Sequence, residues 1–196
     1  MGVASAAWRE VGDGVLVRRY PFLDQSIGIV LGPEGVLVVD TRSSAGQAEE
    51  IRRAVRELTA LPIVAAVDTH HHWDHSFGNR ALRPIPIWGH ARCARRLVES
   101  AEAMREAHAA EAPGIGEVVV DPPDRTFEEH AVVEITGRRV ELRYLGRGHT
   151  DDDIVALVTD AGILFAGDLL ENGAPPWYGD AYPLDWPETA SRLLEL

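Results

Sequence analysis

Thr69-His70-His71-His72-Trp73-Asp74-His75 is the stretch of sequence that most constrains the fold and the chemistry of this chain. Four of the chain's eight histidines lie in the last six residues of this stretch. The stretch directly follows Ile63–Val67, a continuous apolar run that predicts a buried strand. The histidines are therefore expected in a loop at the carboxyl end of a strand, where layered α/β proteins commonly carry their sites.

The spacing of the polar residues in this stretch favours a metal site. Imidazoles and a carboxylate packed this closely cannot all be buried as neutral core groups, whereas a divalent cation takes both as ligands. His70 and His72 would point to the same side of an extended backbone, so both can reach one ion. Asp74 and His75 follow where the chain turns and can reach a second ion. His71 is out of phase with its neighbours and is expected to point away from the metals.

Two later segments offer further ligands. Gly146–Thr150 lies between two predicted strands and contains His149, which could complete a three-histidine site with His70 and His72. Three protein ligands and one position open for water are typical of a catalytic zinc rather than a structural one. Asp168 ends another apolar run and could bridge two ions.

These motifs together resemble those of the metallo-β-lactamase superfamily. The match comprises His70-x-His72-x-Asp74-His75, Gly148-His149-Thr150 and Gly167-Asp168 in the family's order, preceded by Val38-Val39-Asp40-Thr41 at a strand end. It covers nearly the whole chain, from about Val11 to Leu196. The resemblance implies a mixed α/β fold: a four-layer αββα sandwich, with two sheets face to face, helices outside and a metal site at one edge.

The resemblance also implies a ligand set. His70, His72 and His149 would hold the first metal, and Asp74, His75 and Asp168 would hold the second. The expected cofactor is zinc, as one or two ions, with iron or manganese as alternatives. Zinc lowers the pKa of bound water to about 7, so hydroxide is available at neutral pH. Asp74 is the expected catalytic residue, because it would orient this hydroxide and could take its proton.

The chain departs from the family pattern after His149. The family usually has one more histidine, a ligand of the second metal, and this sequence has no histidine beyond that position. We therefore expect residues 1–196 to form a single metallo-β-lactamase-like domain that is C-terminally truncated and lacks the last strand or helix. The alternative is a second metal held by fewer protein ligands. In either case, the second site is expected to bind its metal more weakly.

The expected activity is hydrolysis of a small ester, thioester or lactone by a metal-bound hydroxide. Many β-lactamases of this superfamily have a cysteine near the position of Asp168, and Cys93 is too far from that motif to replace it. A β-lactamase is therefore an alternative, as are a phosphodiesterase or nuclease and an iron-dependent enzyme of persulfide or oxygen chemistry. The non-enzyme alternative is a metal-binding or scaffold protein.

Composition limits the partners of the chain. Its 196 residues include 19 basic and 31 acidic side chains, which give a net charge of −12. This charge opposes binding to nucleic acid and to anionic membranes, and no apolar run reaches the roughly 18 residues that span a bilayer. A single cysteine and an N-terminus without signal-peptide features favour the cytoplasm. We expect a small-molecule substrate and leave the oligomeric state open.

The remaining histidines and Cys93 are expected to have structural roles. His90 is expected at a helix N-terminus or on the surface, and the alternative is that it lines the site. His108 and His130 lie in charged stretches and are expected in solvent. Trp73 is expected to pack beside the site, and Cys93 to be a small buried residue in a helix.

Other segments carry less specific signals. Asp40 and one of Asp151–Asp153 could support a ligand histidine from behind. Residues 171–182 form a long aromatic loop that either flanks a substrate pocket or covers a sheet edge. Short apolar runs predict strands, including Ile85–Trp88 and Val118–Val120.

Overall fold

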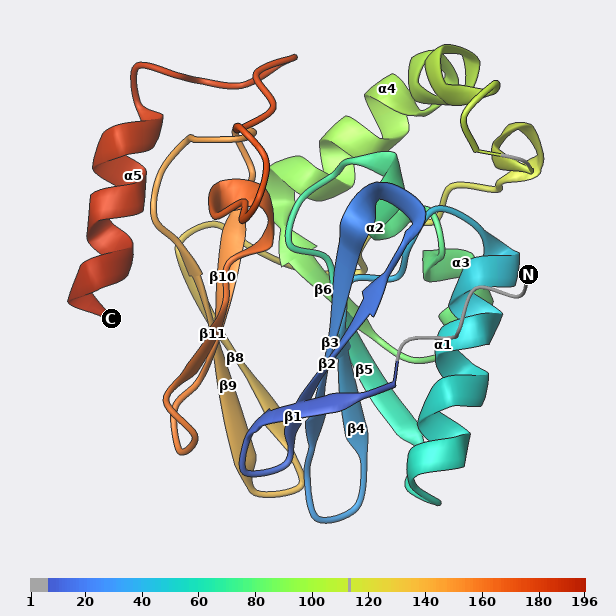
Figure 1. Cartoon of the computed structure of the whole chain (residues 1–196), viewed down its shortest axis with the longest axis vertical. Coiled ribbons are helices and arrows are strands. Elements are labelled where there is room, and N and C mark those ends of the chain that lie inside the picture. The colour runs from blue at the N-terminus through green and yellow to red at the C-terminus, as the bar shows by residue number, and fades with distance from the viewer. Residues whose placement is uncertain (1–6, 113) are drawn as a thin grey trace.

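The computed structural model describes residues 7–112 and 114–196, which form two β-sheets packed face to face with helices on both outer sides (Figure 1). This arrangement confirms the expected αββα sandwich. The first sheet has the strand order β1-β2-β3-β4-β5-β6-β7, and the second has the order β11-β10-β9-β8.

The first sheet begins with antiparallel hairpins and continues with parallel strands. Its strands are β1 (Arg9–Gly12), β2 (Val15–Tyr20), β3 (Gln25–Leu31), β4 (Val36–Val39), β5 (Ile63–Val67), β6 (Ile87–His90) and β7 (Arg125–Phe127). β4 to β7 pair in parallel, so their carboxyl ends meet at one edge of the sheet. The histidine-rich stretch follows β5 and therefore lies at this edge.

The second sheet is antiparallel throughout. Its strands are β8 (His130–Ile135), β9 (Arg138–Tyr144), β10 (Ile154–Val158) and β11 (Ile163–Phe165). β9 and β11 both run antiparallel to β10 between them, so their carboxyl ends lie at a common edge. His149 follows β9 and Asp168 follows β11, which brings these two distant residues to one end of the sandwich.

Helices cover the outer face of each sheet. They are α1 (Ala45–Leu58), α2 (Trp73–Ser76), α3 (Asn79–Leu82), α4 (Ala91–His108) and α5 (Trp186–Arg192), with short 3-10 turns at Phe22–Asp24, Ile115–Glu117, Gly167–Leu169 and Leu193–Glu195. Ser44 caps α1, because its side chain accepts a hydrogen bond from the backbone N–H of Gln47. α5 packs on the second sheet through Trp186, while the other helices lie beside the first sheet. None of the described helices is long and apolar enough to cross a bilayer.

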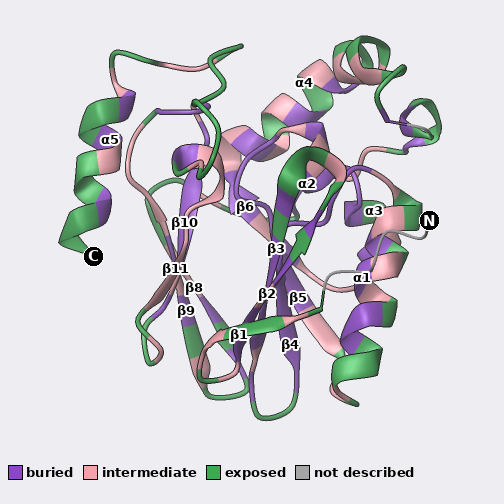
Figure 2. Ribbon diagram, viewed as in Figure 1, coloured by how far each residue is buried: buried purple, intermediate pink, exposed green. Residues whose placement is uncertain are grey.

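The main core lies between the two sheets, and it takes every second residue of several facing strands. Figure 2 shows that the central strands β3 and β4 are buried along most of their length. Its members from the first sheet are Val15, Val30, Leu37, Ala65 and Val67, and those from the second are Val133, Ile135, Val140, Leu142, Ile154, Ala156 and Val158. A second cluster fills the space under α1. The two clusters show that strands β2 to β5 bury both faces, so the loops that follow them have a rigid base.

One glycine sets how closely the sheets approach each other. The ring of Phe165 on β11 lies against the backbone of Gly28 on β3, and a Cβ atom at Gly28 would overlap that ring. Phe165 is the strand residue closest in sequence to Asp168. The contact therefore fixes the end of β11, and with it the candidate ligand, against the first sheet.

Two expectations about strands need correction. Val118–Val120 is not a strand, because the backbone N–H of Val118 bonds to Ile115 within a turn and Val118 packs under α4. The partner of β6 is β7, which lies after Pro122 and Pro123. β6 itself begins at Ile87, two residues later than expected, after Pro84 and Pro86. Proline has no backbone N–H to give to a sheet ladder.

Candidate metal centre

Asp40 holds the start of the histidine-rich loop in place. It follows β4 at the shared edge, is almost fully buried, and accepts hydrogen bonds from the backbone N–H of Thr69 at 2.8 Å and from the Thr69 hydroxyl at 3.0 Å. Its other contact is with His75, whose Nδ1 lies 2.8 Å from Asp40 Oδ2. Because a carboxylate only accepts, this nitrogen carries a proton, and His75 turns its Nε2 toward the site. Asp40 therefore supports the candidate ligand His75 from behind, as the sequence predicts.

Three histidine nitrogens converge at one point of this edge. His72 Nδ1 lies 3.1 Å from His70 Nε2 and 2.9 Å from His149 Nε2. Burial, together with the neighbouring imidazoles, holds the pKa of His70 well below its usual range and lowers that of His149 to about 4. The rings of His70 and His149 are therefore neutral at pH 7, and each can present a lone pair to the point where the three nitrogens meet. The three residues form a group that could hold a metal ion.

The carboxylates of Asp74 and Asp168 lie beside this group. His75 Nε2 is 3.3 Å from Asp74 Oδ2 and 3.4 Å from Asp168 Oδ1. Asp168 Oδ2 is also 3.6 Å from His149 Nε2, so Asp168 lies between the two histidines. His70, His75 and Asp168 form a second group that could hold an ion. Asp74 adjoins this second group through His75.

The charges of His75, Asp74 and Asp168 are coupled. Burial opposes the ionisation of each of these three side chains, but the opposite charges of its neighbours outweigh burial. The carboxylates of Asp168, Asp74 and Asp40 raise the pKa of His75 well above its usual range. The imidazole of His75 in turn lowers the pKa of Asp74 and that of Asp168. Both carboxylates are thus ionised at neutral pH.

The donor set fits a divalent cation. Neutral imidazole nitrogens and ionised carboxylates are the ligands that zinc and similar ions take. Nε2 of His70 and Nε2 of His149 both lie close to Nδ1 of His72, and an ion at this point would take one lone pair from each of the three rings. The structure thus brings together all six residues singled out from the sequence: His70, His72, Asp74, His75, His149 and Asp168.

The loop over residues 171–182 flanks this centre. Of the two expected positions, beside a pocket or over a sheet edge, the first agrees with this arrangement, because Glu171, Asn172 and Ala174 line a cavity. Asp180 Oδ1 lies 3.1 Å from His72 Nε2, the ring nitrogen that faces away from His70 and His149. The Trp177 ring lies 5.5 Å from that of His72 and 5.8 Å from that of His149, between ring centroids. Glu171 forms a further group with His149 and Asp168 that could hold an ion. Sequence analysis noted the aromatic residues of this loop and missed both acidic ones.

The acidic residues Asp151–Asp153 mainly hold the loop around His149 in place. Asp151 pairs with Arg96, and Asp153 accepts hydrogen bonds from the backbone N–H and the hydroxyl of Thr150. Asp152 accepts from the backbone N–H of His71 at 3.0 Å, and its other oxygen lies 2.9 Å from His71 Nδ1. His71 is thus turned toward Asp152 and is not part of the three-nitrogen group, as its phase in the sequence predicts.

The other histidines fall into three environments. His90 caps α4 by accepting from the backbone N–H of Arg92, which confirms its expected place at a helix N-terminus. His130 is 52% exposed, as expected for a solvated residue. His108 was expected in solvent as well, but it stacks on the ring of Trp73 at 4.7 Å and is 28% exposed. Trp73 itself is buried beside the site, and Cys93 is buried in α4.

Comparisons with known proteins agree with this arrangement. Residues 20–196 match the family model described as the metallo-beta-lactamase superfamily. The chain is similar to acyl-coenzyme A thioesterase MBLAC2 of Bos taurus, with 26% identity over 216 aligned residues, 97% of this chain and 76% of that protein. It is also similar to a type 2 metallo-beta-lactamase of Bacteroides fragilis, with 23% identity over 168 residues, 84% of this chain and 61% of that protein.

Solved structures show the same fold. A metallo-beta-lactamase from Pontibacter korlensis has a TM-score of 0.78 and 22% identity, and the match covers 97% of this chain and 85% of that one. DIM-1 metallo-beta-lactamase has a TM-score of 0.77 and 20% identity, with 99% of this chain and 85% of that one covered. At these identities the likeness concerns the fold, and the chemistry must be argued from the residues.

Proposed function

Because this chain belongs to the metallo-beta-lactamase superfamily, we propose that it is a metal-dependent hydrolase that cleaves a small ester, thioester or lactone. The observation that carries the proposal is the convergence of His70, His72 and His149, which come from loops of both sheets. These three residues would hold the first ion, and Asp74, His75 and Asp168 the second. The ions are proposed to be zinc. A divalent ion held there supplies Lewis-acid polarisation of the substrate oxygen and lowers the pKa of a nearby water molecule.

Asp74 is the proposed proton acceptor. The imidazole of His75 keeps its pKa low in spite of burial, so the carboxylate is ionised and can orient the attacking water and take its proton. The backbone of Asp74 is held from the other side, because the side-chain amide of Gln25 donates a hydrogen bond to its carbonyl. Asp40 fixes the ring of His75, which in turn faces Asp74. These contacts place the base before substrate arrives.

Three observations favour an ester-type substrate over the alternatives. The ligand position after β11 is Asp168 rather than the cysteine that many β-lactamases of the superfamily have. One relative is named as an acyl-coenzyme A thioesterase, which supports thioesters as a substrate class. The net charge of −12 opposes a polyanionic substrate such as nucleic acid.

Elemental analysis of the purified protein, followed by turnover of a substrate panel, tests the proposal. The panel contains thioesters, lactones, nitrocefin and bis(4-nitrophenyl) phosphate. We expect zinc and hydrolysis of the thioesters or lactones. Hydrolysis of nitrocefin alone would identify a β-lactamase, and hydrolysis of the phosphodiester alone a phosphodiesterase. Iron without any hydrolysis would overturn the proposal in favour of redox chemistry.

A further inference from the structure

A cavity of about 680 Å³ lies beside the candidate metal centre. Asp74, His75 and Asp168 line one end of it, and strands β1 to β3 line the rest together with the segment that follows β11. This volume falls in the range of small-molecule sites. The metal ligands account for only one end of the cavity, so the remainder is available for a part of the substrate away from the reacting bond.

The strand register carries Arg9 into this cavity. Arg9 lies opposite Val17, Val17 opposite Gly28, and Gly28 opposite Val39, so these residues form one row across four strands. Residues directly opposite in antiparallel strands project to the same face of the sheet. Phe165 of the second sheet packs on Gly28, so this face is the inner one. Three strand spacings of about 4.8 Å place Arg9 about 14 Å from Val39, the neighbour of Asp40.

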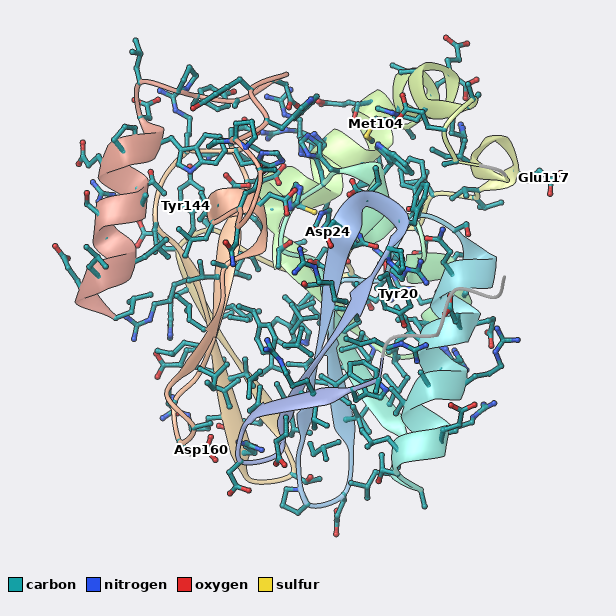
Figure 3. The ribbon with its side chains drawn as sticks, in the orientation of Figure 1. Tyr20, Asp24, Met104, Glu117, Tyr144 and Asp160 are labelled. Carbon is teal, nitrogen blue, oxygen red and sulfur yellow. The ribbon has the colours of Figure 1, made fainter. Side chains whose placement is uncertain are left out.

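Within the described part of the chain, Arg9 is the cation of the cavity that has no anionic partner. Arg19 also lines the cavity, but its guanidinium is paired with the carboxylate of Asp24 at the end of the β2–β3 hairpin, where Figure 3 labels Asp24. The side chain of Arg9 makes no hydrogen bond or ion pair with any residue in 7–112 or 114–196, while its backbone pairs with β2. A free guanidinium in a cavity of a strongly acidic chain is suited to an anion, because it offers a planar pair of N–H donors.

The cavity also has apolar lining beside its polar groups. Val17, Leu164, Phe165 and Leu170 contribute it. Leu170 is 58% exposed, and such apolar surface is stabilised when a hydrocarbon chain covers it. The cavity therefore offers hydrolytic groups at one end, apolar lining, and a cation at the other end.

We propose that this cavity selects esters or thioesters that carry an anionic group, a carboxylate or a phosphate, at the far end of an apolar chain, and that Arg9 binds this group. The proposal rests on the proposed hydrolase function and adds a substrate class to it. Asp24 moderates the selection, since it neutralises Arg19 and adds a negative charge to the same wall.

Binding to the chelator-treated, metal-free protein tests the anion site without any contribution from a metal. The probes are octanoate, octyl phosphate and the neutral octanamide, measured by calorimetry. We expect at least one anion to bind about tenfold more tightly than octanamide, as one charge-assisted contact provides. The better of the two anions identifies the group as a carboxylate or a phosphate. Equal binding of all three probes would overturn the proposal.

Three variants test whether Arg9 causes the preference for anions. Arg9→Gln removes the charge from an exposed side chain and should abolish the preference for anions. Arg95→Gln, at an exposed arginine on α4 that pairs only weakly with Glu99, is the matched control and should leave the preference unchanged. Asp24→Asn frees the charge of Arg19 and should therefore strengthen anion binding severalfold. The fold should be kept, because asparagine tolerates the positive φ of 54° at this position. An unchanged preference in Arg9→Gln would refute the assignment.

Turnover separates this proposal from the proposed function. The metal-loaded protein is given 4-nitrophenyl octanoate and the mono-4-nitrophenyl ester of suberic acid, which differ in the charge at the far end. We expect a lower KM for the suberate ester, lost in Arg9→Gln with kcat retained. Equal KM values for two hydrolysed esters would refute anion selection and leave the hydrolase function standing. Arg9-dependent anion binding without hydrolysis of either ester would uphold the anion site and contradict the hydrolase function.

Discussion

At the scale of single residues, Asp40 contacts His75 and His75 contacts Asp74, so each side chain sets the orientation or the ionisation of the next. Asp40 fixes the ring of His75, and His75 keeps Asp74 ionised. The sequence spacing predicts the candidate ligands well, because His70 and His72 are two residues apart and the geometry between them is local. It does not predict Asp180, whose partner His72 is 108 residues away and which belongs to no motif. Local spacing is readable from sequence, whereas a long-range contact depends on how the loops fold.

Replacement of Asp74 tests its proposed role as the proton acceptor. Asp74→Asn keeps the size of the side chain and removes its basicity, so kcat for the best ester or thioester should fall by about 10²- to 10⁴-fold. His70, His72 and His149 are untouched, so the first ion should stay bound when metal content is measured in the same sample. Full turnover in Asp74→Asn with bound metal would remove Asp74 from the mechanism.

Asp180 is expected to act on metal affinity through His72. A carboxylate on the outer nitrogen of a ligand histidine fixes the ring and raises its basicity, and loss of such a partner lowers metal affinity by about 10- to 100-fold. Asp180→Ala should therefore release zinc to a competing chelator at lower chelator concentrations than the unmodified protein does. Asp185→Ala is the control, because Asp185 pairs with Arg147 and has no contact with a histidine. Identical zinc affinity in both variants would contradict this role.

Among the secondary-structure elements, the apolar strands and the long helices were predictable, and the two edge strands of the first sheet, β1 and β7, were not. β5 and β10 are continuous apolar runs, β3 ends in one at Ile27–Leu31, and α1 has a capping serine and a regular apolar face. β1 and β7 are short and contain charged residues, so nothing in their own sequence distinguishes them from loops. They are strands because β2 and β6 offer them an open edge. Such pairing is a property of the assembled sheet.

Gly28 is predicted to control the distance between β3 and β11. Gly28→Ala forces Phe165 away from the first sheet, and overpacking of this kind typically costs about 1–3 kcal/mol of unfolding free energy. Gly46, near the start of α1, is the matched control, because a Cβ atom there meets nothing within 4 Å. Gly46→Ala should be neutral or stabilise the protein by up to about 1 kcal/mol. Urea unfolding of both variants in the metal-free state measures the difference. Equal stabilities would show that the sheets adjust without strain.

At the scale of the whole molecule, the candidate centre joins two sheets whose shared core is apolar. The loop after β5 belongs to the first sheet, while His149 and Asp168 follow strands of the second. The residue types in the sequence offered His149 as a third ligand beside His70 and His72, but only the family resemblance predicted the two face-to-face sheets whose stacking brings residues 70 and 149 together. An ion held by ligands of both sheets binds the folded chain and has no such site in the unfolded chain.

Zinc should therefore stabilise the entire fold in a concentration-dependent way. A ligand that binds only the native state adds about 2.7 kcal/mol at a free concentration one hundred times its Kd. Thermal unfolding should show a Tm that rises with zinc and falls again on chelation. Magnesium should give a much smaller rise, since it prefers octahedral oxygen ligands to imidazole. In His149→Ala the first ion loses the one of its three ligands that comes from the second sheet. The zinc-dependent rise in Tm of this variant, measured from its own metal-free baseline, should therefore be much smaller. A full rise in that variant would mean that zinc binding does not need His149, and the three-histidine centre would have to be abandoned.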